Sequence, residues 1–288
     1  MSSAILPISE STCVLRATDR FKGRSHALAP GSSAVRWLHY GRIILDAGDP
    51  PVTFSNDDHE TGLICLKGKS TVTAAGQTFT MTQYDAVYIP RDSKIEVQAG
   101  DACESGGALR LDGACCDFAE VSAPVEGHYP LKFVPFSAVR SDPGLHFKAG
   151  SPSNQRDLNI LIGKNVEAGR IVAGVTFSEP GNWTSWPPHE HAELLEEAYL
   201  YIDMPKPAWG VQFVYTNPNQ PELAAVVHEG DCVVMPQGYH PNVSAPGGSI
   251  NFLWMMAAHR ETTDRLFGVV NVQPEYAGGG SGLERGQK

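Results

Sequence analysis

The sequence predicts an all-β protein built from two similar domains in tandem. Residues 61–98 alternate short strand-forming runs, at 63–66, 70–73, 78–81 and 86–89, with turn signals at Gly68 and Gly76. Strand-forming runs separated by frequent turns, without helical periodicity, are typical of a β-sandwich or β-barrel. The chain has 288 residues and is long enough for two such domains.

The second half of the chain repeats the layout of the first. The segment DAVYIP at residues 85–90 aligns with DCVVMP at 231–236, an offset of 146 residues (231 − 85) and close to half the chain. A repeat of this size predicts a duplicated domain. We expect an N-terminal domain at residues 1–150 and a C-terminal domain at 151–277, connected through the Pro- and Gly-containing stretch 137–155. The glycine-rich end, 278–288, is expected to be a flexible tail.

Composition excludes several classes of protein. The formal net charge of −10 argues against a nucleic-acid binder, which needs a basic face. No apolar run approaches the roughly 18 residues that span a bilayer, so we expect no membrane partner. Residues 1–11 lack the basic start and apolar block of a secretory signal. The six cysteines show no Cys-x-x-Cys spacing, which favours free thiols and a cytoplasmic location.

The strongest candidate site begins with His189 and His191, which are one residue apart. On an extended segment their side chains point the same way. Glu196 and Glu197 follow five and six residues after His191, and His240 comes from a later strand. A set of three histidines and one glutamate suits a divalent metal with positions open for substrate. We therefore expect one divalent ion per chain, either Zn, Mn or Fe.

The repeat predicts that only the second domain holds metal. The first half has no His-x-His, and the offset of 146 places Lys94 opposite His240. A lysine ammonium is a donor only and repels a cation. We expect the first domain to be structural or to supply a contact in a homo-oligomer.

These motifs resemble the two conserved motifs of the cupin superfamily and, more narrowly, those of the 5-deoxy-glucuronate isomerase family. The segments that carry the resemblance are GNWTSWPPHEH at 181–191, EEAYLY at 196–201, FVYT at 213–216, PQGYHP at 236–241 and FLWMMA at 252–257. The related 4-deoxy-5-threo-hexosulose-uronate ketol-isomerases share the Glu-x-Tyr-x-Tyr strand and the metal set. The match is strongest over residues 150–260; the first half agrees in layout more than in motif.

The resemblance implies a bicupin, with two jelly-roll-like β-barrels in tandem, and an aldose–ketose isomerase. The implied reaction converts 5-deoxy-D-glucuronate to 2-deoxy-5-keto-D-gluconate in myo-inositol catabolism, so the partner is a small deoxy-uronic acid. Two other classes use the same scaffold: a metallocupin dioxygenase and a non-catalytic sugar-binding bicupin. The chain shows no Gly-x-Gly-x-x-Gly or Walker-type loop, so we expect no nucleotide cofactor.

The sequence leaves open which of two glutamates, Glu196 or Glu197, binds the metal. The superfamily spacing favours Glu196, whereas the resemblance to the Glu-x-Tyr-x-Tyr strand favours Glu197. We prefer Glu197, because strand alternation places it on one face with Tyr199 and Tyr201. Glu196 then points to the opposite face, as a surface or interface charge.

Five further residues are candidates for substrate chemistry. Tyr199 shares the strand face of Glu197, and Tyr239 is adjacent to His240, so both are expected to be catalytic. Arg156, in an Asn-x-Arg context that resembles the family, can clamp a carboxylate with two hydrogen bonds. Gln212 and Tyr215, on a strand after the turn at 205–207, are expected to line the substrate cavity.

Overall fold

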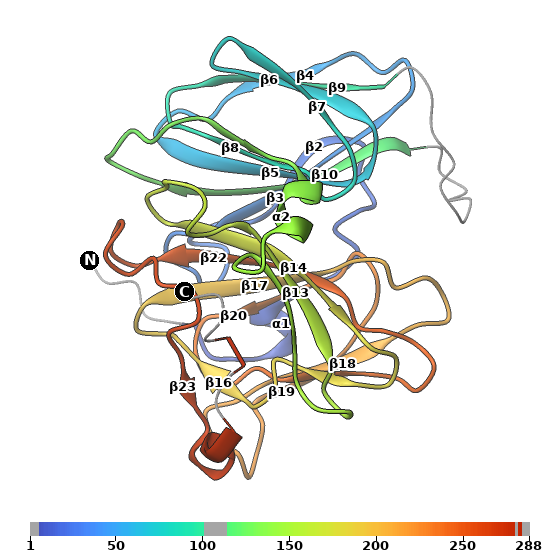
Figure 1. Ribbon diagram of the computed structural model, residues 1–288, viewed down its shortest axis with the longest axis vertical. Helices are drawn as coiled ribbons and strands as arrows, with labels where there is room; N and C mark the ends of the chain where they lie inside the picture. Colours follow the sequence, from blue (N-terminus) through green and yellow to red (C-terminus); the bar gives the residue numbers. More distant parts are fainter. Residues whose placement is uncertain (1–5, 101–113, 280–281, 284–288) are drawn as a thin grey trace.

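The computed structural model describes residues 6–100, 114–279 and 282–283, and they form two β-barrels stacked along the long axis (Figure 1). The strands that build the first barrel are β2 (Gly23–Leu28), β3 (His39–Asp46), β4 (Val52–Ser55), β5 (His59–Gly68), β6 (Ser70–Ala74), β7 (Gln77–Met81), β8 (Ala86–Ile89), β9 (Lys94–Ala99), β10 (Ala114–Pro124) and β11 (Lys132–Val134). They form one six-stranded sheet, in the order β11-β8-β5-β10-β3-β2, and one four-stranded sheet, in the order β4-β9-β6-β7.

The second barrel has the same two-sheet plan. Its strands are β1 (Val14–Leu15), β12 (His146–Ala149), β13 (Arg156–Ile162), β14 (Ile171–Ser178), β15 (Trp183–Thr184), β16 (His189–Glu190), β17 (Leu195–Tyr201), β18 (Gly210–Val214), β19 (Leu223–Val227), β20 (Cys232–Met235), β21 (Asn242–Ser244), β22 (Phe252–Ala258) and β23 (Asn271–Val272). The large sheet runs β1-β20-β17-β22-β14-β13-β12 and the small one β15-β21-β18-β19, while β16 and β23 form a separate pair. Helices α1 (Glu10–Cys13) and α2 (Phe136–Ser141) and the 3-10 helix η1 (Pro274–Gly279) are short.

The matching strand orders confirm the prediction of two tandem jelly-roll-like barrels in an all-β fold. Strands β11, β8, β5, β10, β3 and β2 of the first large sheet correspond in order to β1, β20, β17, β22, β14 and β13 of the second. The large sheets face each other in the middle of the molecule (Figure 1), where β5 and β10 contact β14. An apolar layer between two sheets lets each barrel bury a face that it could not bury alone.

The ends of the domains differ from the expected ranges. Strand β1 lies near the N-terminus, yet it pairs with β20 of the second barrel. Strand β12, within the expected N-terminal range 1–150, pairs with β13 and also belongs to the second large sheet. We therefore propose that the change of barrel occurs at α2, between β11 and β12. In the expected tail, Leu283 is buried, and residues 280–281 and 284–288 lie outside the described part of the chain.

The position of Lys94 corrects one sequence inference. Lys94 is exposed at the start of β9, whereas its neighbour Ile95 is buried in the first barrel. A shift of one residue moves a strand side chain to the other face of the sheet. A fixed offset of 146 therefore does not identify the residue that faces the barrel interior, and Lys94 does not stand inside the first barrel.

Two further observations concern the helices and the cysteines of the described residues. None of their helices is long and apolar enough to cross a membrane. The cysteines at 13, 65, 116 and 232 are free and buried, as expected from their spacing. Cys103 lies outside the described residues.

Candidate metal centre

Strand β17 carries the carboxylate of the candidate site. It pairs with β20 and β22, so it is the central strand at this point of the large sheet. Glu197, Tyr199 and Tyr201 alternate along one face of β17, and this face lies inside the barrel, because Glu197 and Tyr199 line a cavity and Tyr201 donates to Gln212 of the small sheet. Glu196 points to the opposite face, where its carboxylate accepts hydrogen bonds from the backbone of the first barrel. The structure therefore brings Glu197, and not Glu196, to the histidines.

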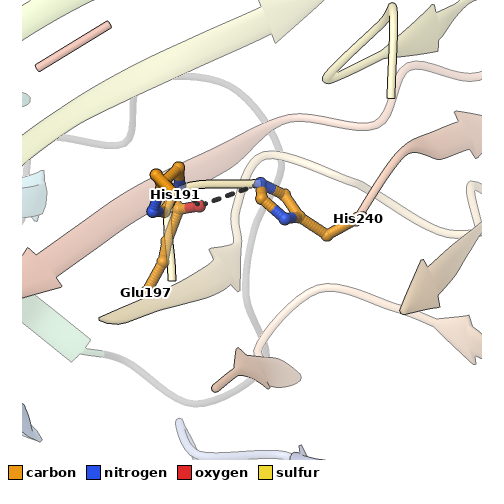
Figure 2. A group of neighbouring side chains, drawn as sticks. All are labelled: His191, Glu197 and His240. Carbon is orange, nitrogen blue, oxygen red and sulfur yellow. Dashed lines mark hydrogen bonds and ion pairs between the residues drawn. The ribbon is translucent and has the colours of Figure 1, made fainter. Parts of the chain in front are cut away.

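His191, Glu197 and His240 converge in the interior of the second barrel (Figure 2). The Oε2 atom of Glu197 lies 3.1 Å from Nε2 of His191 and 3.2 Å from Nε2 of His240. All three side chains are buried. The fourth predicted ligand, His189, is adjacent: its ring centroid lies 5.0 Å from that of His240 and 6.4 Å from that of His191.

Backbone carbonyls orient all three imidazole rings. Nδ1 of His189 lies 2.8 Å from the Pro187 oxygen, and Nδ1 of His240 lies 2.9 Å from the Gly238 oxygen. Nδ1 of His191 lies 3.1 Å from the Leu195 oxygen. A carbonyl accepts only from a protonated nitrogen, so each Nδ1 donates and Nε2 is left for another partner. Fixing the tautomer in this way is typical of metal-binding histidines.

The donor set fits a divalent metal ion. Oε1 of Glu197 and Nε2 of His240 are buried and have no hydrogen-bond partner. Buried polar atoms are nearly always paired, because an unpaired one costs about 1–3 kcal/mol. A neutral imidazole would also turn a lone pair toward the carboxylate, which is repulsive. A cation between them would satisfy both groups, and His and carboxylate ligands suit Zn, Mn or Fe.

Charges within this cluster shift its pKa values in opposite directions. Burial, followed by repulsion from His240, lowers the pKa of His189 to about 3, so this ring is neutral near pH 7. Burial opposes the ionisation of Glu197, but its close contacts with the rings of His191 and His240 outweigh it and lower the pKa of Glu197 to about 2. Burial also opposes protonation of His191, yet its hydrogen bond to Glu197 prevails and raises the pKa of His191.

Metal binding should therefore release a proton. In the metal-free protein, His191 is protonated below its raised pKa, and a metal ion can bind its Nε2 only after that proton leaves. Metal affinity should fall as the pH drops through this pKa, by up to about tenfold per pH unit. Calorimetric titration of Zn²⁺ in two buffers with different ionisation enthalpies measures the release. Uptake of Zn²⁺ without proton release at mildly acidic pH would contradict this linkage.

A cavity opens beside His189, His191 and Glu197. Its polar lining includes Arg156, Thr176, Thr184, Ser185 and Tyr199, and its apolar lining includes Leu158, Phe252, Trp254, Met256, Phe267 and Val269. Among the described residues that line it, Glu197 is the only carboxyl group. A small polar ligand in this mostly apolar cavity would therefore meet the Arg156 guanidinium, several hydroxyl groups and the candidate metal ligands His189, His191 and Glu197.

Tyr199 and Arg156 lie where a substrate would bind. The Tyr199 hydroxyl is 2.8 Å from Oγ of Ser185, and its ring centroid lies 5.9 Å from that of His240. Burial, followed by the charge of Glu197, raises the pKa of Tyr199 well above its ordinary value. The hydroxyl therefore stays protonated and can donate a hydrogen bond. Arg156 is buried, and its Nη1 donates to the Asn154 oxygen at 3.2 Å.

The other three predicted substrate residues are not among those that line the cavity. Gln212 is fully buried and accepts from Tyr201, while its Nε2 donates to the His240 oxygen at 2.9 Å. The Tyr215 hydroxyl donates to Oε1 of Gln273. Tyr239 packs its ring against Tyr215, with centroids 5.7 Å apart. A residue next to a ligand in an extended segment faces the other way, which explains the position of Tyr239.

The C-terminal segment contributes to the site in a way that sequence reasoning missed. Phe267, Val269, Val270 and Leu283 line the cavity. Strand β23 pairs with β16, so that Val272 lies opposite His189. No motif identifies this segment; its apolar residues at 266–272 are the only signal in the sequence.

The corresponding position in the first barrel holds no metal ligand. Thr61 lies opposite Ile89 in the first barrel, as Glu197 lies opposite Met235 in the second. Thr61 is buried, and the interior around it is filled by apolar residues such as Leu63, Ile89 and Ile95. Among the described residues, the cluster in the second barrel is the one group with metal-ligating geometry.

The chain is similar to known proteins in sequence and in fold. A family model described as the KduI/IolB family matches residues 15–268. The 5-deoxy-glucuronate isomerase of Geobacillus thermodenitrificans (strain NG80-2) is 30% identical over 217 residues, which cover 69% of this chain and 73% of the relative. The 4-deoxy-L-threo-5-hexosulose-uronate ketol-isomerase of Shouchella clausii (strain KSM-K16) is 28% identical over 250 residues, with coverage of 81% and 84%.

Solved structures show the same fold. The crystal structure of an IolB-like protein from Salmonella typhimurium LT2 superposes with a TM-score of 0.77 at 22% identity, covering 92% of this chain and 98% of that one. Oxalate decarboxylase from Bacillus subtilis superposes with a TM-score of 0.56 at 12% identity, with coverage of 88% and 77%. At 22% and 12% sequence identity, the structural similarity concerns the fold, which is the arrangement of the two barrels.

Proposed function

The chain belongs to the KduI/IolB family and is an isomerase, and we propose that it converts 5-deoxy-D-glucuronate to 2-deoxy-5-keto-D-gluconate with one divalent metal ion. The observation that carries the proposal is a single cavity lined by His189, His191, Glu197 and Arg156, with His240 in contact with Glu197 behind it. Such a cavity can hold the carbonyl end and the carboxylate end of one sugar acid. The relatives whose names contain 5-deoxy-glucuronate support this choice of substrate.

We propose that His189, His191, Glu197 and His240 hold the metal, with Zn, Mn or Fe as candidates. Four protein ligands on a five- or six-coordinate ion leave one or two positions for substrate oxygens. When bound, such an ion would polarise the substrate carbonyl and stabilise negative charge on its oxygen. The interior position of all four side chains would keep competing water away.

The reaction moves one hydrogen between adjacent carbons. In the enediol route, a proton leaves C2 of the aldose and a proton is added to C1, while the hydroxyl proton on O2 moves to O1, so the product is an isomer. We propose that the protonated Tyr199 hydroxyl donates a hydrogen bond to one of these oxygens. Arg156 would bind the carboxylate at the far end of the six-carbon chain with two hydrogen bonds. Gln212 and Tyr215, whose polar groups are engaged with protein atoms, would support the wall of the site.

The metal-loaded protein should turn 5-deoxy-D-glucuronate into a ketose. Proton NMR in ordinary water follows the disappearance of the aldehyde-hydrate signal. If the protein turns over no deoxy-uronate but consumes oxygen with a phenol when loaded with iron, the dioxygenase alternative replaces this proposal. Tight sugar binding without turnover in any metal form would instead indicate a binding protein.

Turnover in deuterated water should place deuterium on C6 of the ketose, the carbon that was C1 of the aldose. The proton would pass through an exchangeable group, because Tyr199, Glu197, His189 and His191 are titratable groups that line the cavity. Mass spectrometry and NMR of the ketose measure the label. An unlabelled product would rule out an exchanging base and leave the isomerase assignment intact.

The setting of the enzyme follows from the same proposal. We expect a small sugar acid as the binding partner, and no binding to nucleic acid or to a membrane. The four buried free thiols support a cytoplasmic location.

A further inference from the structure

Two buried glutamates reach across the contact between the barrels in opposite directions. Glu196, on β17 of the second barrel, accepts backbone N–H bonds from three consecutive residues of the first: Arg36 at 2.8 Å, Trp37 at 2.7 Å and Leu38 at 2.6 Å. Glu60, on β5 of the first barrel, accepts from three consecutive residues of the second: Gly169 at 2.7 Å, Arg170 at 2.6 Å and Ile171 at 2.7 Å. Their exposed fractions are 2% and 0%.

The two glutamates occupy equivalent positions in the duplicated fold. Ile89 and Met235 are equivalent, because they occupy the same place in the repeated segments 85–90 and 231–236. Their strand partners, Thr61 and Glu197, are therefore equivalent as well. The residues before these two, Glu60 and Glu196, correspond in the same way. The donor segments also meet each other, because the Arg170 guanidinium lies 3.9 Å from the centroid of the Trp37 ring. Each barrel therefore supplies three amide donors to a carboxylate of the other.

Only Glu196 has metal-site groups on both sides of it. The preceding residue, Leu195, accepts the Nδ1–H of His191 on its carbonyl oxygen, and the following residue is Glu197 itself. At Glu60 the corresponding neighbours are His59 and Thr61, which do not form a metal-ligating cluster among the described residues. The two interactions are thus alike in their three backbone donors, although Glu60 also accepts from the Tyr88 hydroxyl at 2.7 Å, and they differ in what they adjoin.

The start of β17 depends on this interaction more than the rest of the strand. Pairing with β20 begins at Glu197, so Leu195 and Glu196 pair with β22 alone. The three amide bonds from the first barrel restrain this end from a second direction. Hydrogen bonds to a carboxylate are stronger than those between neutral groups, and outer groups that orient ligands change metal affinity by roughly 10- to 100-fold.

We propose that Glu196 is a positioning residue through which the first barrel holds Glu197 and His191 in place for the metal. The inference rests on the proposed metal site, and it gives the first barrel a function although its described residues form no metal-ligating cluster. Glutamine at position 196 would keep one acceptor oxygen and turn an amide N–H₂ toward backbone donors, so at least one of the three bonds would be lost.

The test compares Glu196→Gln with Glu60→Gln as a matched control. Both variants weaken one carboxylate interaction between the barrels, so both should lower the melting temperature. Titration of Zn²⁺ into the metal-free full-length proteins should show a Kd raised about 10- to 100-fold for Glu196→Gln and unchanged within about twofold for Glu60→Gln. The visible spectrum of the Co²⁺ form should change in Glu196→Gln only. Glu196→Asp keeps both oxygens on a shorter side chain and should bind Zn²⁺ with intermediate affinity.

Each outcome of the titration decides between specific positioning and general stability. Equal weakening in Glu196→Gln and Glu60→Gln, or wild-type Kd values in both, would overturn the positioning role while leaving the proposed function standing. If Glu196→Gln does not fold, wild-type affinity in Glu196→Asp, where the donor contacts are stretched, would overturn it. Failure of the wild-type protein to bind Zn²⁺, Mn²⁺ or Fe²⁺ would instead overturn the proposed metal site.

Discussion

Replacing His240 with alanine should remove most of the bound metal and the isomerase activity with it. His240 is buried, its Nδ1 is held by the Gly238 oxygen, and its Nε2 is directed at Glu197. Loss of a ligand should cost more affinity than the roughly 10- to 100-fold that follows loss of an outer hydrogen bond. Elemental analysis after dialysis should find one ion per wild-type chain and far less than one in the variant.

His228 offers the matched control for this experiment. Its side chain is 59% exposed and lies outside the metal cluster, with Nδ1 4.0 Å from Oδ2 of Asp231. His228→Ala should therefore leave metal content and turnover unchanged, which excludes nonspecific binding to surface histidines. Two ions per wild-type chain, or full metal retention in both His240→Ala and His189→Ala, would contradict a single site in the second barrel.

Local periodicity predicted the parts of the site that lie on one strand. Alternation along residues 196–201 placed Glu197 on the face of Tyr199 and Tyr201. In the structure Glu197 and Tyr199 line the cavity and Tyr201 donates to Gln212 of the small sheet, so this face lies inside the barrel. The same argument sent Glu196 to the opposite face, as a surface or interface charge, and the structure has it at the contact between the barrels. Its partners could not be predicted, because the donors at residues 36–38 are 158 to 160 positions away and act through the backbone, which leaves no side-chain motif.

Inferences from adjacency in sequence were less successful than those from alternation. Lys94 was aligned with His240 by a constant offset, but insertions between strands change the offset, and one residue reverses the face. Gln212 lies near the site, yet its amide binds the oxygens of residues 213, 240 and 241. Whether a buried polar side chain meets substrate or backbone depends on tertiary contacts that a single sequence does not encode locally.

The cavity wall from residues 267–270 and Leu283 shows a further limit of sequence reasoning. These residues reach the site because β23 pairs with β16, a two-residue contact between segments about 80 positions apart. Short strand pairs carry too few residues for a periodic signal. The glycine-rich composition of 278–288 predicted a tail outside the fold, but composition does not show that Leu283 packs into the cavity.

Replacing Arg156 with methionine should reduce kcat/KM for the deoxy-uronate by roughly 30- to 1,000-fold, mainly through a higher KM. Methionine keeps much of the length of the side chain and removes its charge. Removing one partner of a buried, hydrogen-bonded charge pair costs about 2–4 kcal/mol, which corresponds to this range. The carboxylate lies at the end of the sugar remote from the reacting carbons. Losing the interaction between Arg156 and this carboxylate should therefore weaken substrate binding more than it slows the chemical step.

Metal content separates this effect from damage to the metal centre. Arg156 is not a ligand, so Arg156→Met should retain one ion per chain while its KM rises. Arg140→Met is the control, because Arg140 is 42% exposed and pairs with Asp157 at 2.8 Å on the outside of the barrel; its kinetics should match the wild type. An unchanged KM in Arg156→Met would move the carboxylate site elsewhere in the cavity. Loss of metal together with activity would mean that Arg156 supports the ligands and does not bind substrate. A higher KM with full metal content is the outcome that supports binding of the sugar carboxylate by the Arg156 guanidinium.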